Sequence, residues 1–157
     1  MIWSGHNRKL VASALAILLF ATGCGDDDSD DDAMDEGNQA AEPKDMTPSG
    51  AKVFFLTPSD GATVSSPVQF TMGTENFTIE PSGPVNMGAG HFHLLVDTGC
   101  VTPGETIPSN PGHHHYGGGQ QEAELELSAG EHTVCLQAGD GVHTALDLTE
   151  EIRLIVK

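Results

Sequence analysis

The sequence predicts an all-β protein whose main domain is a β-sandwich of about seven short strands, immunoglobulin-like or cupredoxin-like in architecture. Residues 51–157 contain a series of short segments in which apolar and polar residues alternate, which is the pattern of strands with one buried face. Clusters of Gly, Pro, Asp and Ser separate these segments, as expected for turns. No long stretch has apolar residues at helical spacing, so the sequence favours a β-sandwich.

The first three strands are expected near the start of this domain. Residues 52–57 are mostly apolar and end at a turn in residues 58–61. Pro67 can open the second strand, residues 67–72, because the first residue of a strand need not donate a hydrogen bond. Residues 76–80 are a weaker third candidate before a loop rich in Pro and Gly.

The remaining four strands follow a stricter alternation. In residues 91–97 the apolar side chains point to one side, whereas two histidines and an aspartate point to the other. Residues 98–119 contain several prolines and glycines and are expected to form a long irregular loop; a loop of this length is usually functional or disordered. Residues 121–128, 131–138 and 150–157 alternate again and complete the sandwich.

An export signal is predicted before the domain. Arg8 and Lys9 precede an apolar run in residues 10–20, which is shorter than the about 20 residues that a membrane span needs. The run ends in Ala21-Thr22-Gly23-Cys24, which resembles the lipobox of bacterial lipoproteins, where the cysteine is lipidated and becomes the first mature residue. This resemblance implies a lipoprotein signal peptide in residues 1–23 and a lipid anchor on Cys24. The alternative is an ordinary signal peptide that is cleaved nearby.

The segment from Cys24 to residue 50 is predicted to be an acidic, disordered tether. It is rich in Asp and small residues, so it has little apolar surface to bury and its like charges repel one another. Beyond Cys24 the chain has 23 acidic residues and four of its six basic residues, which is a formal net charge of −19. This charge excludes nucleic acid as an expected partner and favours cations. We therefore expect a protein of the bacterial cell envelope, anchored to a membrane at the outer membrane and periplasm or at the cell surface; its protein partner cannot be named.

Two cysteines remain when Cys24 is set aside. An even pair in an exported protein favours a disulfide between Cys100 and Cys135. Metal-binding thiolates or two free thiols are the alternatives. The spacing contains no CxxC motif, so it gives little support to a thiolate zinc site.

The histidines point to a metal site. His91 and His93 are two residues apart on one face of a predicted strand, with attachment points roughly 7 Å apart, so their ring nitrogens can converge on one ion. His113 or His115 from the long loop and His143 from a turn could join them. Neutral imidazoles suit Cu(II), Zn(II) and Ni(II). Histidines that are exposed or bonded to backbone carbonyls, with no metal, are the alternative.

Other polar residues could support such ligands. The candidates are Asp97 and Asp140 as carboxylates beside an imidazole, and Tyr116 and Gln120 as hydrogen-bonding or lining groups. The three glycines of residues 117–119 could suggest a phosphate cradle. No strand–loop–helix context and no lysine follows them, so this interpretation is rejected.

Four stretches of the domain, residues 54–68, 90–97, 115–120 and 139–143, resemble a family of exported bacterial domains known as domain of unknown function 4399. The resemblance covers residues 51–157. The family commonly has three successive histidines where this chain has His91-Phe92-His93, and often a second histidine after the position of His143, where this chain has none. The family name implies no activity, so the functional prediction depends on the histidines.

We therefore predict an envelope lipoprotein that binds a transition metal, copper first and zinc second, for metal handling or sequestration. One alternative is a non-catalytic, immunoglobulin-like structural or interaction module on the cell surface. A second is a metalloenzyme, because His91-Phe92-His93 resembles the His-x-His strand of copper–zinc superoxide dismutases, which are also β-sandwiches with a disulfide. No catalytic residue is predicted, since neither Ser109 nor Ser128 lies in a nucleophile motif.

Overall fold

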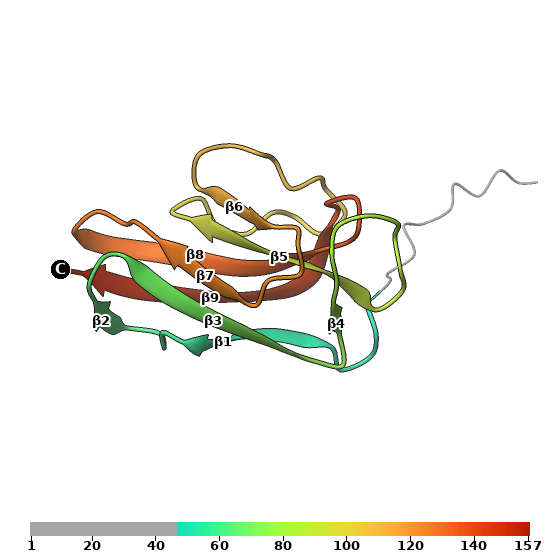
Figure 1. Cartoon of the computed structure of the whole chain (residues 1–157), viewed down its shortest axis with the longest axis horizontal. Helices are drawn as coiled ribbons and strands as arrows, with labels where there is room; N and C mark the ends of the chain where they lie inside the picture. The colour runs from blue at the N-terminus through green and yellow to red at the C-terminus, as the bar shows by residue number, and fades with distance from the viewer. Residues whose placement is uncertain (1–46) are drawn as a thin grey trace, which may run out of the picture. The chain divides into compact units, whose positions relative to one another are not determined.

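The computed structural model describes residues 47–157, which form two packed β-sheets (Figure 1). The predicted all-β sandwich is confirmed. The predicted signal peptide, Cys24 and nearly all of the acidic tether lie outside the described residues. The strands are β1 (Lys52–Thr57), β2 (Ala62–Val64), β3 (Val68–Glu75), β4 (Thr78–Ile79), β5 (Ala89–Val96), β6 (His113–Tyr116), β7 (Glu122–Leu125), β8 (Gly130–Gly139) and β9 (Ala145–Val156).

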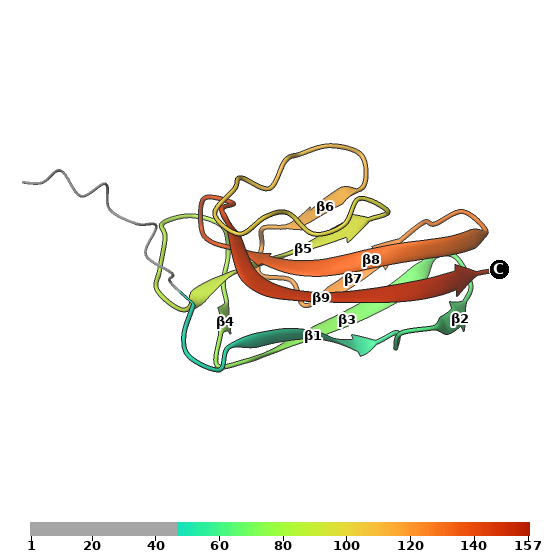
Figure 2. The ribbon, with the colours of Figure 1, turned by 180° about the vertical axis from the view of Figure 1, so that it is seen from behind.

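The smaller sheet has the order β1-β3-β7, and the larger has the order β2-β9-β8-β5-β4 with β6 also paired to β5. The β8–β9 hairpin is the longest pairing, and β5 lies antiparallel to β8. Figures 1 and 2 show β6 and the segment before it on the side of the larger sheet that faces away from β1 and β3. We call this side the outer face.

The core lies between the two sheets and follows from alternation along their strands. From the larger sheet, Phe92 and Leu94 of β5 and Leu136 of β8 are fully buried. From the smaller sheet, Phe70 and Met72 of β3 pack into the same cluster. Each apolar position faces inward because the side-chain period of a strand is two residues.

The structure contains two strands that the sequence pattern did not predict. β2 is three residues long and pairs in parallel with the end of β9. β6 lies inside the stretch expected to be an irregular loop, where residues 113–116 pair with β5. Both strands are short, and β6 is polar, so neither has the apolar alternation on which the prediction depended.

The segment of residues 97–112, which we call the covering loop, folds over the outer face. A disulfide joins Cys100 of this loop to Cys135 of β8, as predicted, with the sulfur atoms 2.02 Å apart. Gln137 of β8 accepts a hydrogen bond from the backbone N–H of Val101 at 2.8 Å and donates one to the Val101 carbonyl at 2.8 Å. Cys135 and Gln137 alternate with the core residues of β8 and so lie on the outer face, where the covering loop leaves both with no exposed surface.

No helix in residues 47–157 could cross a membrane.

Candidate metal centre

Three of the histidines reach the outer face because of the register between β5 and β6. His93 lies directly opposite His115, and Phe92 lies opposite Tyr116. Residues that face each other across paired strands point to the same side of a sheet. Phe92 and Tyr116 therefore point toward the core, whereas His93 and His115 point outward, and His91, two residues before His93, shares their side.

The fourth histidine, His143, comes from the turn between β8 and β9. Asp140 shapes this turn, because its carboxylate oxygen Oδ1 accepts hydrogen bonds from the N–H groups of Val142 and Thr144 at 3.0 and 2.8 Å. The backbone of His143 has a φ of 72°, a left-handed conformation that is uncommon for a residue other than glycine. Its carbonyl accepts a hydrogen bond from Ile107 of the covering loop at 2.9 Å. The turn and the loop together direct this imidazole toward β5.

The four imidazoles of His91, His93, His115 and His143 form one group, which we call the histidine cluster. Nε2 of His91 lies 3.1 Å from Nε2 of His93, and Nε2 of His115 lies 3.1 Å from Nε2 of His143. One ring nitrogen from each of His91, His115 and His143 lies within 4.8 Å of the others. Side chains that were separated in the sequence therefore share one small volume, as a metal site requires.

Burial keeps the inner pair of imidazoles neutral. His91 has no exposed surface and His93 is 3% exposed. Burial, together with the charges that neighbouring imidazoles would carry, lowers the pKa of His91 from 6.5 to about 4 and that of His93 to about 3. Burial and His143 also lower the pKa of His115. Near neutral pH these three rings hold lone pairs that can bind a cation.

One nitrogen of the buried pair has no hydrogen-bond partner. Within residues 47–157, nothing donates to or accepts from Nδ1 of His91, although this atom is buried. Nε2 of the same ring faces only another imidazole. Because a buried polar group without a partner costs free energy, nearly all such groups are paired in native proteins. The arrangement therefore points to a ligand.

Two glycines make room for the rings. A Cβ atom at Gly117 would lie 2.2 Å from Cε1 and 2.3 Å from Nε2 of His115. A Cβ atom at Gly139, which lies opposite His91 in the register, would come within 3.0 Å of Nε2 of His93. The glycine run that resembled a phosphate cradle thus gives space to an imidazole. Sequence reasoning missed this role, because Gly117 follows the end of β6 and Gly139 lies on a different strand from His93, so no local pattern marks either glycine.

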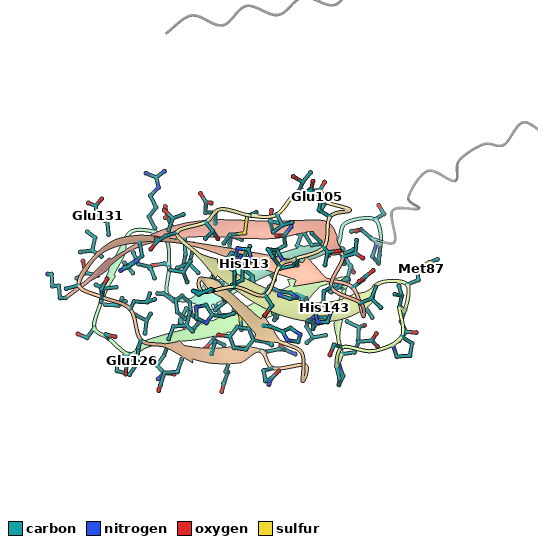
Figure 3. All side chains as sticks on the ribbon, turned by 90° about the horizontal axis from the view of Figure 1, so that it is seen from above. Met87, Glu105, His113, Glu126, Glu131 and His143 are labelled. Carbon is teal, nitrogen blue, oxygen red and sulfur yellow. A yellow bond between two sulfur atoms is a disulfide. The ribbon has the colours of Figure 1, made fainter. Side chains whose placement is uncertain are left out.

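The other candidate residues lie in several places. His113 is outside the histidine cluster, with Nδ1 2.9 Å from the Pro108 carbonyl and Nε2 3.1 Å from the Thr98 hydroxyl. Figure 3 looks onto the outer face. It shows His113 and His143 over the middle of the sandwich and Met87 at its edge.

The supporting groups are similarly dispersed. Asp140 is close enough to His91 for its charge to act on that ring, and it holds the turn that carries His143. Tyr116 packs against the core, and burial raises its pKa to about 12. Gln120 accepts a hydrogen bond from the N–H of Gly118 at 2.8 Å. Asp97 follows the end of β5, where it contacts His132 rather than the cluster.

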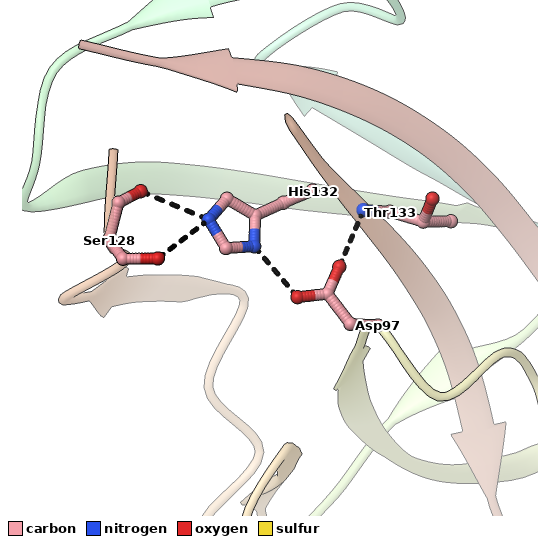
Figure 4. A network of polar contacts seen from close by, with 4 residues as sticks. All are labelled: Asp97, Ser128, His132 and Thr133. Atoms are coloured by element: carbon pink, nitrogen blue, oxygen red, sulfur yellow. Dashed lines mark hydrogen bonds and ion pairs between the residues drawn. The ribbon is translucent and has the colours of Figure 1, made fainter. Parts of the chain in front are cut away.

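Asp97, His132 and Ser128 form a row that resembles a hydrolase triad (Figure 4). Nδ1 of His132 lies 2.7 Å from the Asp97 carboxylate, and its Nε2 lies 3.3 Å from the Ser128 hydroxyl and 3.0 Å from the Ser128 carbonyl. A carbonyl oxygen only accepts, so Nε2 must carry a hydrogen, and the Asp97 contact raises the pKa of His132. A ring that donates to both Asp97 and the Ser128 carbonyl has no lone pair with which to accept the proton of Ser128, so the row has a structural role.

Comparison with known proteins assigns no activity to the chain. No curated protein matches it. The solved fibronectin(III)-like modules of Clostridium thermocellum CbhA are 19% identical to it, with a TM-score of 0.41, and the match covers 67% of this chain and 96% of that one. A family model, described as a domain of unknown function (DUF4399), matches residues 69–157, which include the whole histidine cluster. The resemblance found in the sequence is thereby confirmed, and the chain belongs to the DUF4399 family.

Proposed function

We propose that this protein binds one late transition-metal ion, copper or zinc, through the histidine cluster, and that it serves in metal handling or sequestration. The observation that carries the proposal is the buried His91 ring, whose Nδ1 has no partner in residues 47–157 and whose Nε2 faces another imidazole nitrogen. Two neutral imidazoles can share one N–H···N hydrogen bond at this contact, and in either tautomer of His91 its Nδ1 stays without a partner within the described residues. A cation would instead bind a nitrogen of each ring directly.

The position of the cluster also supports binding. His91 and His93 are held on a strand whose other face is the core, and His115 is held opposite His93 by pairing between strands. Ligands on such rigid elements lose little freedom when an ion binds. His115 is exposed and His143 is partly exposed, so an ion can reach the cluster from solvent.

We further propose that the domain acts in the bacterial cell envelope, attached to a membrane by a lipid on Cys24. Support comes from the Ala21-Thr22-Gly23-Cys24 sequence after a short apolar run, and from the acidic stretch that separates it from the sandwich. An acidic chain near the membrane would raise the local concentration of metal cations. Radiolabelled palmitate incorporation, with Cys24→Ser as the control, tests the anchor.

Calorimetric titration of the untagged, metal-free protein with Cu(II) or Zn(II) tests the metal proposal. We expect binding of about one equivalent, as for a single shared site. Replacing His91 and His93 together with Asn should abolish it. His114→Gln, in the same strand as His115 but on its other face, is the matched control and should bind like the parent. His113→Gln should also leave the stoichiometry unchanged. Unchanged binding by the His91 and His93 double variant would refute this site.

Gly117→Ala is expected to weaken metal binding with little loss of folding. The new methyl group would occupy the space of the His115 ring, which is exposed and can rotate away. Loss of ligand orientation of this kind costs roughly 10–100-fold in metal affinity. Gly118→Ala is the control, because its Cβ would meet only the flexible end of Gln120 at 3.0 Å. Equal affinities for the two variants would contradict the proposed role of Gly117.

A further inference from the structure

The four rings of the histidine cluster are arranged as the corners of a tetrahedron. Their six centre-to-centre separations are 4.9 Å for 91–93, 4.8 Å for 91–115, 4.9 Å for 91–143, 5.1 Å for 93–115, 5.8 Å for 93–143 and 4.6 Å for 115–143. A tetragonal copper site would place the four rings at the corners of a planar square. Each of the two diagonals of that square would be about 1.4 times as long as a side. The four rings can be assigned to the corners of a square in three ways. In each of these assignments, at least one of the two diagonals would be no longer than 5.1 Å, which is too short for a square. The arrangement is therefore three-dimensional rather than planar.

The size of this tetrahedron matches a metal bound by imidazoles. A zinc ion about 2.0–2.1 Å from each nitrogen would lie about 3.2 Å from each ring centre, which places the ring centres about 5.2 Å apart. The observed separations of 4.6–5.8 Å lie on both sides of that value. The same geometry requires nitrogens about 3.3 Å apart, and two pairs are already 3.1 Å apart. Nitrogens of His91, His115 and His143 already lie within 4.8 Å of one another, so the four-ligand site requires the His93 ring, whose centre is 5.8 Å from that of His143, to turn toward them.

We infer that the histidine cluster is a closed, tetrahedral site of four imidazoles that selects Zn(II) by its shape. This inference rests on the proposed metal-binding function. Zn(II) has no electronic preference against a tetrahedron, and its sites with four protein ligands are tetrahedral. Cu(II) favours square-planar or tetragonal surroundings, which the rings do not offer. Geometry thus places zinc before copper, the reverse of the order expected from the sequence.

A closed set of ligands also limits what the ion can do. Catalytic zinc sites keep one position for water, whereas sites with four protein ligands hold the ion without activating water. Here all four positions belong to histidines. A cavity of about 330 Å³ has His93, His115 and His143 in its wall, together with residues of the covering loop. It gives the ion a route to the rings, and once bound the ion would be held by protein nitrogens alone. Storage or transfer of zinc fits this site, and hydrolysis does not.

Cobalt(II) is the probe for this geometry. We expect the metal-free, untagged protein to take up Co(II) with the intense visible bands of a four-coordinate ion, and Zn(II) should displace it. The single variants His91→Asn, His93→Asn, His115→Asn and His143→Asn should each weaken Zn(II) binding by more than the roughly 10–100-fold that loss of an outer hydrogen-bond partner costs. X-ray absorption of the zinc-loaded parent protein should show four imidazole nitrogens, and this measurement needs no variant to fold.

The outcomes separate the inference from the proposed function. Weak bands of six-coordinate Co(II), or a zinc-loaded protein with three imidazoles and a water, would overturn the closed tetrahedral site while leaving metal binding intact. A His93→Asn variant that is folded and binds Zn(II) as the parent does would overturn it as well. No uptake of Zn(II), Co(II) or Cu(II) by the folded parent protein would refute both.

Discussion

Acidification from pH 6.5 toward pH 4 is expected to destabilise the metal-free domain steeply. His91 and His93 are buried with pKa values of about 4 and about 3 in the folded protein, against an ordinary value of 6.5 in the unfolded chain. Over this interval the unfolded chain binds protons that the folded protein does not, so stability falls as pH falls. Each ring contributes up to about 1.4 kcal/mol per pH unit, and the two together cost on the order of 5 kcal/mol across the interval.

Urea denaturation at a series of pH values, with a chelator present, measures this effect. His91→Gln and His93→Gln should each reduce the slope of stability against pH by about half, because each variant removes one of the two groups. His132→Gln provides a control of opposite sign. The pKa of His132 is raised by Asp97, so its contribution is fully present below pH 6.5 and is lost as pH rises through the folded pKa. Stability of the parent protein that is flat between pH 6.5 and pH 4 would contradict the assignment of two buried neutral imidazoles.

Loss of the disulfide is expected to lower the free energy of unfolding by an amount similar to that expected for acidification. Cys100 and Cys135 are 35 residues apart, and closing a loop of this length reduces the entropy of the unfolded chain by an amount worth about 3–4 kcal/mol. The bond also attaches the covering loop to β8, next to Gln137, whose side chain holds the Val101 backbone. Without the bond we expect the loop to open more often, and the zinc affinity of the cluster to fall with it.

The double variant Cys100→Ser/Cys135→Ser, compared with the oxidised parent by chemical denaturation, measures this cost. Reductant should reproduce the effect in the parent and leave the double variant unchanged. A Gln137→Ala variant with the disulfide intact separates the two attachments of the loop, because it removes only the hydrogen bonds to Val101. If the double variant unfolds at the same denaturant concentration as the parent, the disulfide does not hold the covering loop in place.

Alternation along single strands was sufficient to predict the fold class and half of the site. A strand with one face in the core must place every second residue on the other face, so the pattern from Phe92 to Val96 assigned His91 and His93 to one side. The strands at residues 52–57 and 131–138 were predicted within a residue or two of β1 and β8 for the same reason. An even pair of cysteines in a chain predicted to be exported was enough to predict the disulfide.

The rest of the site depends on contacts between distant segments. Residues 113–116 are polar and lie among prolines and glycines, so no local pattern marks them as a strand. They pair with residues 92–95 of β5, beyond the two residues that β4 occupies. This pairing brings His115 into the cluster and leaves His113 outside it. The burial of Cys135 and Gln137 was missed for a related reason. Alternation shows which side of a sheet a residue faces, and it does not show what covers that side.

Because apolar residues and histidines alternate along β5, packing its apolar face into the core also places His91 and His93 on the outer face. A shift of one residue in the pairing of β5 with β8 would turn Phe92 away from the core and place the polar rings of His91 and His93 in the apolar interior. Burial of the apolar face therefore disfavours a one-residue slip that would turn the imidazoles of β5 away from His115 and His143. Strand pairing thus positions the imidazoles of the histidine cluster, so a cation bound there would lose little of its attraction to ordering the chain.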